Sequence, residues 1–137
     1  MTVHRKTKFF CLNQWHSASE LIDLEGVPLW ISDVQKVVRF CLYNEKHFAF
    51  STSGSTGKSK VLEHSRSTLF ASAQATIDYF DLKPGNTALL CLPAKFTGGA
   101  MMIIRACLGG IQLVLEEPNL APSGLNHIDF LPLTPAQ

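Results

Sequence analysis

The amino-acid sequence predicts an α/β fold in which helices cover the faces of a layered sheet. Two apolar runs, 87–92 and 111–115, have the composition of strands that are buried on both faces. The segment between them, 100–108, has the composition of a helix and ends in two glycines, which accommodate a left-handed cap. Strands and helices alternate along the chain, and this order favours an α/β sheet with right-handed crossovers. From residue 116 the chain is polar and proline-rich, and one further strand is expected at 128–133.

Two capping-box patterns predict helices in the first third of the chain. After a short predicted strand at 8–12, Ser17 and Glu20 have the spacing of a capping box that opens a short helix. Ser32 and Gln35 have the same spacing and predict a second, clearer helix. Its apolar residues recur on one face, which we expect to pack on a sheet: Val34, Val37, Val38, Cys41 and Leu42.

The stretch 48–60 changes abruptly from an apolar run to hydroxyls, glycines and lysines, which indicates a strand, 47–51, that enters an anion-binding loop. The glycines let backbone N–H groups approach a ligand, the hydroxyls donate hydrogen bonds, and Lys58 and Lys60 supply positive charge. These groups suit a polyphosphate, although a solvated turn has a similar composition. The candidate binding residues are Thr52, Ser53, Gly54, Ser55, Thr56, Gly57 and Lys60.

A P-loop of the NTPases or phosphotransferases is the alternative for this stretch. The end of that motif is present, but the glycine required at its start falls on Thr52. A P-loop also enters its helix at the lysine, whereas 60–64 has an extended pattern. We therefore predict two strands joined by the loop, followed by a helix that begins only near Ser65. This helix, 65–80, has an apolar face made by Leu69, Phe70, Ala73, Ile77 and Phe80.

Composition narrows the classes of function. The 137 residues suffice for one globular unit, and the formal charge of +1 with scattered basic residues argues against binding to nucleic acid or to a membrane surface. No signal core or membrane span is expected. The five histidines lack metal-ligand spacing, so we expect no metal site in the protein itself. The four cysteines lie in apolar contexts, which predicts buried reduced thiols and a cytoplasmic protein: Cys11, Cys41, Cys91 and Cys107.

The loop 52–60 closely resembles the signature loop of the adenylate-forming superfamily, the acyl-CoA synthetases and their relatives, with Ser59 where many members have proline. The segment 92–99 resembles the second landmark of that superfamily, which lines the acyl pocket, and Phe96 takes its aromatic or histidine position. Residues 100–110 and 129–137 are most similar to the o-succinylbenzoate–CoA ligases of menaquinone synthesis.

This resemblance covers 48–137 and implies that residues 1–137 are the N-terminal part of an AMP-binding domain, without a counterpart of the family's C-terminal domain. It implies an acid–thiol ligase that adenylates a carboxylic acid with ATP and Mg²⁺ and transfers the acyl group to coenzyme A. Lys60 then matches the catalytic lysine of the loop, and Phe96 and Gly99 would contact the acid. We expect this polypeptide alone to be inactive, and a non-catalytic remnant that binds nucleotide is a further alternative.

Arg105 interrupts the apolar pattern of the 100–108 segment, and a guanidinium in such surroundings needs a partner. In one interpretation it binds the second carboxylate of the acid, which agrees with the resemblance because o-succinylbenzoate carries two carboxylates. In the other, Arg105 faces the carbonyls at the end of its helix or pairs with Glu116 or Glu117. The sequence leaves both interpretations open.

Overall fold

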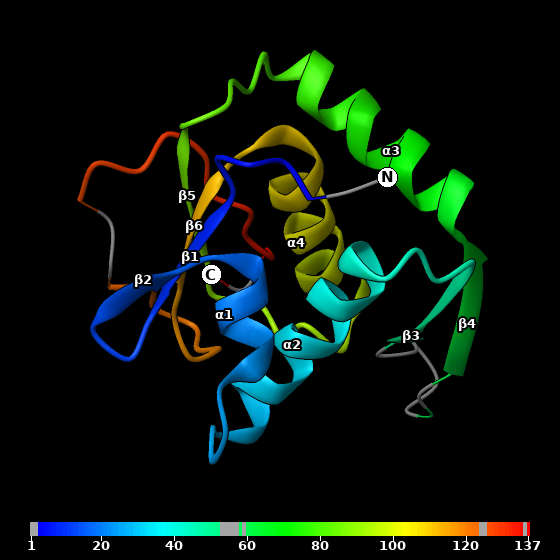
Figure 1. Cartoon of the computed structure of the whole chain (residues 1–137), viewed down its shortest axis with the longest axis horizontal. Coiled ribbons are helices and arrows are strands. Elements are labelled where there is room, and N and C mark those ends of the chain that lie inside the picture. The colour runs from blue at the N-terminus through cyan, green and yellow to red at the C-terminus, as the bar shows by residue number, and fades with distance from the viewer. Residues whose placement is uncertain (1–2, 53–57, 59, 124–125, 136) are drawn as a thin grey trace.

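The computed structural model describes residues 3–52, 58, 60–123, 126–135 and 137. Over these residues it forms a four-stranded sheet, a separate two-stranded ribbon and four helices (Figure 1). The predicted α/β class is confirmed. The strands are β1 (Lys8–Cys11), β2 (Gln14–His16), β3 (His47–Thr52), β4 (Lys60–Ser65), β5 (Thr87–Leu90) and β6 (Gln112–Leu115). The helices are α1 (Ala18–Asp23), α2 (Leu29–Leu42), α3 (Arg66–Tyr79) and α4 (Thr97–Gly109).

The larger sheet has the strand order β2-β1-β6-β5. β5 and β6 run parallel and are joined through α4, as the sequence predicts, and β1 also pairs parallel with β6. β2, which the sequence did not predict, returns antiparallel to β1. The intervening Leu12 and Asn13 have positive φ angles of 52° and 63°, which suit a two-residue hairpin turn.

The first capping box forms as predicted. Ser17 is the N-cap of α1, where its hydroxyl accepts a hydrogen bond from the Glu20 N–H at 3.2 Å. The Glu20 carboxylate accepts in turn from the Ser17 N–H at 3.4 Å. Two N–H groups at the start of the helix are thereby satisfied.

The second predicted capping box is wrong, because α2 begins at Leu29, after Pro28. Ser32 already lies in the first turn, and its N–H donates to the Pro28 carbonyl at 3.0 Å. The buried Gln35 side chain instead donates to the carbonyls of Leu21 and Leu24, at 2.9 and 3.0 Å, at the end of α1. α2 packs mainly on α1 and α4, so its expected place directly on a sheet is also wrong.

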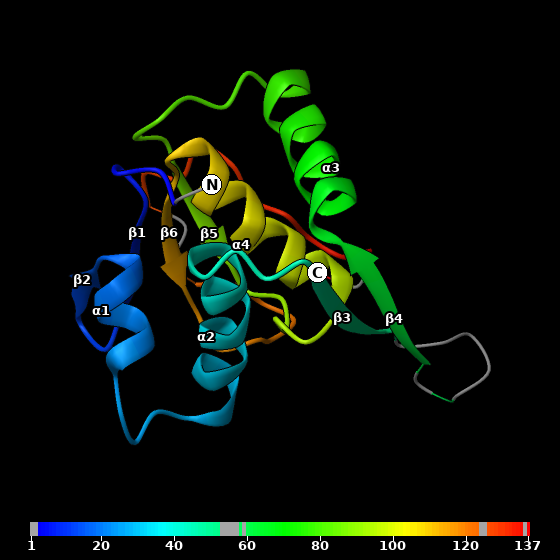
Figure 2. The same cartoon turned by 45° about the vertical axis from the view of Figure 1, so that its right-hand side comes forward.

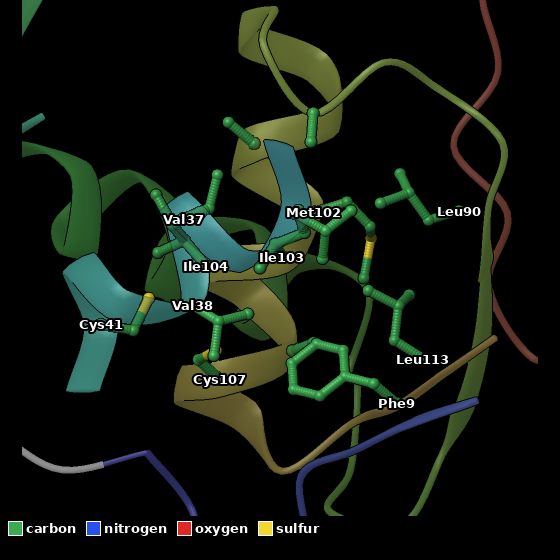
Figure 3. Close-up of a cluster of buried hydrophobic side chains, with 14 of the residues drawn as sticks. Phe9, Val37, Val38, Cys41, Leu90, Met102, Ile103, Ile104, Cys107 and Leu113 are labelled. Atoms are coloured by element: carbon green, nitrogen blue, oxygen red, sulfur yellow. The ribbon is translucent and has the colours of Figure 1, made fainter. Parts of the chain in front are cut away.

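α4 lies at the centre of the molecule, between the four-stranded sheet and the helices α2 and α3 (Figure 2). Met102, Ile103 and Ile104 are fully buried, and Figure 3 shows them between side chains of α2 and of the sheet. All four cysteines are buried and free, as predicted. A hydrogen bond with Cys41 and burial raise the pKa of the Cys107 thiol well above its usual value. Among the described residues, no helix is both long and apolar enough to span a bilayer.

Several element boundaries in the structure differ from the predicted ones. α4 begins at Thr97 rather than at residue 100, and its left-handed cap is Gly110, with φ of 72°. The expected strand at 128–133 is wrong: Phe130 makes only an isolated parallel bridge to Ala88. Phe80, predicted on the buried face of α3, is 53% exposed and packs against the Phe130 ring at 5.1 Å.

Arg66 closes the end of α2. Its guanidinium donates to the carbonyls of Phe40 and Cys41 at 2.6 and 2.8 Å, and it lies over the rings of Phe40 and Phe70 at 5.1 and 4.3 Å from their centroids. The last carbonyls of a helix lack the intrahelical N–H partners that earlier ones have, and the guanidinium supplies donors to two of them. The junction of β4 and α3 is thereby attached to α2.

We expect Arg66→Ala to lower the free energy of unfolding by about 2 kcal/mol, because two carbonyls lose charged donors and two rings lose a stacked cation. Arg66→Lys is the matched control, because lysine keeps the positive charge but lacks the planar set of guanidinium donors. It should lower the free energy of unfolding by about half as much. Urea denaturation followed by circular dichroism measures both. An Ala variant within about 0.5 kcal/mol of the wild type would contradict this role for Arg66.

Candidate phosphate-loop site

The predicted strand–loop–strand arrangement is confirmed. β3 and β4 are antiparallel and in register from Thr52↔Lys60 to His47↔Ser65. α3 begins only at Arg66, with Ser65 as its N-cap. A P-loop would instead enter its helix at the lysine, so this geometry counts against the P-loop interpretation.

The two ends of the loop are held together at Thr52 and Lys60. The Thr52 hydroxyl lies 3.3 Å from both the N–H and the carbonyl oxygen of Lys60, accepting from the first and donating to the second. Lys58 and Lys60 are both exposed. The other candidate loop residues lie outside the described part of the chain: Ser53, Gly54, Ser55, Thr56 and Gly57.

The second motif, 92–99, lies beside the end of β3, the strand that leads into the predicted loop. The Ser51 N–H donates to the Lys95 carbonyl at 3.0 Å, and Ser51 forms a parallel bridge with Phe96. Phe96 is the N-cap of α4 and is half-buried, with the Lys95 ammonium 5.1 Å from its ring centroid. α4 starts without a side-chain cap or an acidic residue in its first turn, so the positive end of its dipole is not neutralised by its own sequence.

Gly99 is needed for the close approach of two backbone segments. A Cβ atom there would overlap the Pro93 carbonyl oxygen and lie 2.7 Å from the Pro93 carbonyl carbon. The first turn of α4 therefore packs directly on the backbone of residues 92 and 93. This contact accounts for the glycine by itself, and the contact of Gly99 with an acid remains a prediction.

Arg105 lies on α4, two turns from Phe96, and is half-buried. Its Nε is buried and has no hydrogen-bond partner among the described residues, and burial lowers the pKa of the guanidinium. The helix-end carbonyls are satisfied by other groups: Ala106 O accepts from the Thr7 hydroxyl at 2.8 Å, and Cys107 O accepts from the His4 N–H at 2.8 Å. No ion pair joins Arg105 to an acidic residue within the described part of the chain.

A cavity of about 360 Å³ opens beside the second motif. Its walls come from the first turn of α2, the 93–95 segment and the segment that follows β6. Trp30 and three prolines make it largely apolar, and Asp33, Lys95 and Glu117 supply charge. Trp30 and Lys95 were not predicted as site residues, because no spacing rule relates residues that only the packing of α2 on this turn brings together.

No protein-family model and no curated protein matches the sequence. Among solved structures, the chain is similar to a Dyadobacter fermentans protein described as acyl-CoA synthetase (AMP-forming)/AMP-acid ligase II-like, with 29% sequence identity and a TM-score of 0.76. The match covers 85% of this chain and 34% of that protein. The inhibitor-bound N-terminal domain of FACL13 from Mycobacterium tuberculosis has 24% identity over 53% of this chain and 18% of its own, and its TM-score of 0.47 carries no argument. The first similarity supports a fold of the adenylate-forming type.

Proposed function

We propose that this chain is the N-terminal part of an adenylate-forming acid–thiol ligase whose acid is o-succinylbenzoate. The observation that supports the proposal is the contact of β3 with the Lys95–Phe96 turn, because it joins the strand that leads into the proposed phosphate loop to the proposed acid-pocket motif. The similarity to an AMP-forming acyl-CoA synthetase-like structure supports the ligase class. The assignment of the acid rests on the resemblance of the sequence and on Arg105.

In the proposed reaction, a carboxylate oxygen of the acid attacks the α-phosphorus of ATP and pyrophosphate leaves. The thiol of coenzyme A then attacks the acyl carbon, and AMP leaves. Mg²⁺ would neutralise much of the charge on the departing phosphates. The chain would contribute the Lys60 ammonium, which would stabilise pyrophosphate as it departs. The Thr52 hydroxyl, which bonds to the N–H and carbonyl of Lys60, would hold the two strand ends together.

The acid would bind along the first three turns of α4. Phe96, the N-cap of α4, would contact the acid, and Arg105 would supply a guanidinium whose buried Nε has no hydrogen-bond partner among the described residues. A partly desolvated guanidinium fits a carboxylate better than any neutral group does. We therefore assign the distal carboxylate of the acid to Arg105.

The phosphate role is tested by binding of Mg²⁺–pyrophosphate to the purified chain, measured by calorimetry. We expect Lys60→Ala to weaken binding by about tenfold or more, because a charge-assisted hydrogen bond is worth about 1.5 to 3 kcal/mol. Lys58→Ala is the matched control, since this exposed lysine occupies a position that the superfamily leaves variable, and it should change binding by less than about threefold. Equal losses in both variants would indicate unspecific attraction of the anion and would refute the assignment of Lys60.

A further inference from the structure

The cavity of about 360 Å³ lies at the carboxyl ends of two parallel strands. Pro93 follows the end of β5 by three residues, Glu117 follows the end of β6 by two, and both line the cavity. In open α/β sheets, ligands bind in the crevice outside the carboxyl ends of the strands. Small-molecule sites are also mostly apolar cavities of this size with a few polar groups. The cavity therefore has the place and the size of a ligand site.

Contacts of the backbone hold the walls of this cavity in place. Pro93 lies directly under the first turn of α4, where Gly99 lets the two backbones approach. On the opposite wall, the carbonyl oxygen of Glu117 accepts from the Asn119 side chain at 2.8 Å and from the Cys91 thiol at 3.8 Å. Three of the lining residues are prolines, whose φ angles are fixed by their rings. The cavity is therefore formed before any ligand enters.

An indole and a carboxylate reach the cavity from one face of α2. Trp30 and Asp33 are three residues apart on this helix, so they are neighbours on its surface, and both line the cavity. The Asp33 side chain is only 17% exposed. Its Oδ1 lies 3.4 Å from the Nζ of Lys36, an exposed lysine, and its Oδ2 has no partner among the described residues. An exposed lysine compensates a largely buried carboxylate only weakly.

A second carboxylate comes from the segment after β6. The two adjacent glutamates there differ: the Glu116 carboxylate accepts from the Ser123 N–H at 3.0 Å and from its hydroxyl at 2.6 Å. The Glu117 side chain lines the cavity and makes no hydrogen bond or ion pair within the part of the chain that the structure describes. Lys95 also lines the cavity, but its ammonium lies 5.1 Å from the ring centroid of Phe96, which does not. The cavity thus has an excess of negative charge beside an indole.

We propose that this cavity binds a small organic ammonium ion. The positive charge lies on the Trp30 ring between the carboxylates of Asp33 and Glu117, and the alkyl groups of the ligand contact the prolines. Tryptophan is the side chain whose ring attracts a cation most strongly, and such rings recognise alkylated ammonium groups. The site goes beyond the proposed ligase activity, because Phe96 and Arg105, the proposed contacts of the acid, do not line it. Few contacts hold so small a ligand, so we expect a dissociation constant on the order of 1 mM.

Titration with choline, followed by NMR, tests the proposal. The chain has two tryptophans, and choline should shift the indole N–H signal of Trp30 to saturation while that of Trp15, on β2, stays in place. Sodium chloride at equal ionic strength is the control for salt. The second ligand is the neutral isostere of choline, in which a carbon atom replaces the nitrogen, and it should bind at least about tenfold more weakly. Equal binding of both ligands, or no saturable shift, would overturn the proposal.

Charge variants test which carboxylate the cation meets. Glu117→Gln keeps the size of the side chain and removes its charge, and it should weaken choline binding at least about fivefold. Glu63→Gln is the matched control, because it changes the net charge equally at an exposed position on β4 that does not line the cavity. Both glutamates are exposed, so neither substitution should disturb folding. Equal losses would indicate general attraction by the surface charge and would refute the site.

Ring variants test the indole. Choline affinity should fall from the wild type to Trp30→Phe and further to Trp30→Leu, because phenylalanine keeps a weaker π face and leucine has none. The backbone amide shifts of Ala94 and Lys95 report binding when Trp30 is replaced, and circular dichroism verifies the fold. A folded Trp30→Leu variant that binds choline as tightly as the wild type would contradict the role of the ring.

Discussion

Gly99→Ala is expected to lower the free energy of unfolding by about 3 kcal/mol or more, and the melting temperature by about 10 °C. The added methyl would overlap the Pro93 carbonyl oxygen and lie 3.0 Å from the Leu92 carbonyl oxygen. Both are backbone atoms and cannot rotate away as a side chain would. To remove this overlap, the whole 92–95 turn would have to move away from α4. That movement would also disturb the hydrogen bond that Lys95 O accepts from the Ser51 N–H.

Gly98→Ala is the control for this substitution. It makes the same chemical change one position earlier, but its Cβ would meet only the Leu92 Cδ1 at 3.4 Å, an ordinary contact with a side chain. Because alanine favours helices more than glycine does, Gly98→Ala should be neutral or stabilising by up to about 1 kcal/mol. Thermal and urea unfolding of both variants measure the difference. If the two alanines had similar effects, close packing of α4 on residues 92 and 93 would not be the reason for Gly99.

Arg105→Lys, placed in a complete ligase that contains this chain, is expected to lower kcat/KM for o-succinylbenzoate by about tenfold to a hundredfold. Lysine keeps the positive charge but loses the planar arrangement of donors that matches a carboxylate. The KM for ATP should be nearly unchanged, because the loop residues Thr52 and Lys60 are untouched. Steady-state kinetics with each substrate varied in turn measures both constants.

Benzoate analogues without the succinyl carboxylate supply the control for Arg105. They have no group for the guanidinium to bind, so wild type and Arg105→Lys should use them equally well. A loss of the same size toward both kinds of acid, or a lowered melting temperature without a change in specificity, would make Arg105 a structural residue. The buried Nε of Arg105, which has no partner in the described part of the chain, is the reason to expect the specific outcome.

Sequence patterns predicted those features that neighbouring residues decide. The break from apolar residues to hydroxyls, glycines and lysines after residue 51 predicted a hairpin with a late helix, and β3, β4 and α3 follow that prediction. The Ser17–Glu20 box formed because both partners lie within one turn. The same spacing at Ser32 and Gln35 did not form a capping box. The Gln35 side chain is buried and donates instead to distant carbonyls at the end of α1.

By itself, the sequence determined the α/β class, the β3–β4 hairpin and the buried state of the cysteines, since these follow from local periodicity and hydrophobicity. Tertiary structure alone decided which segments meet. The contact of Ser51 with Lys95 and the approach of Gly99 to Pro93 depend on how α4 lies against the sheet and the ribbon. So does the burial of Arg105 Nε without a partner among the residues that the structure describes. Such contacts join residues distant in the chain, where the packing of whole elements, and not the pattern along any one of them, sets the geometry.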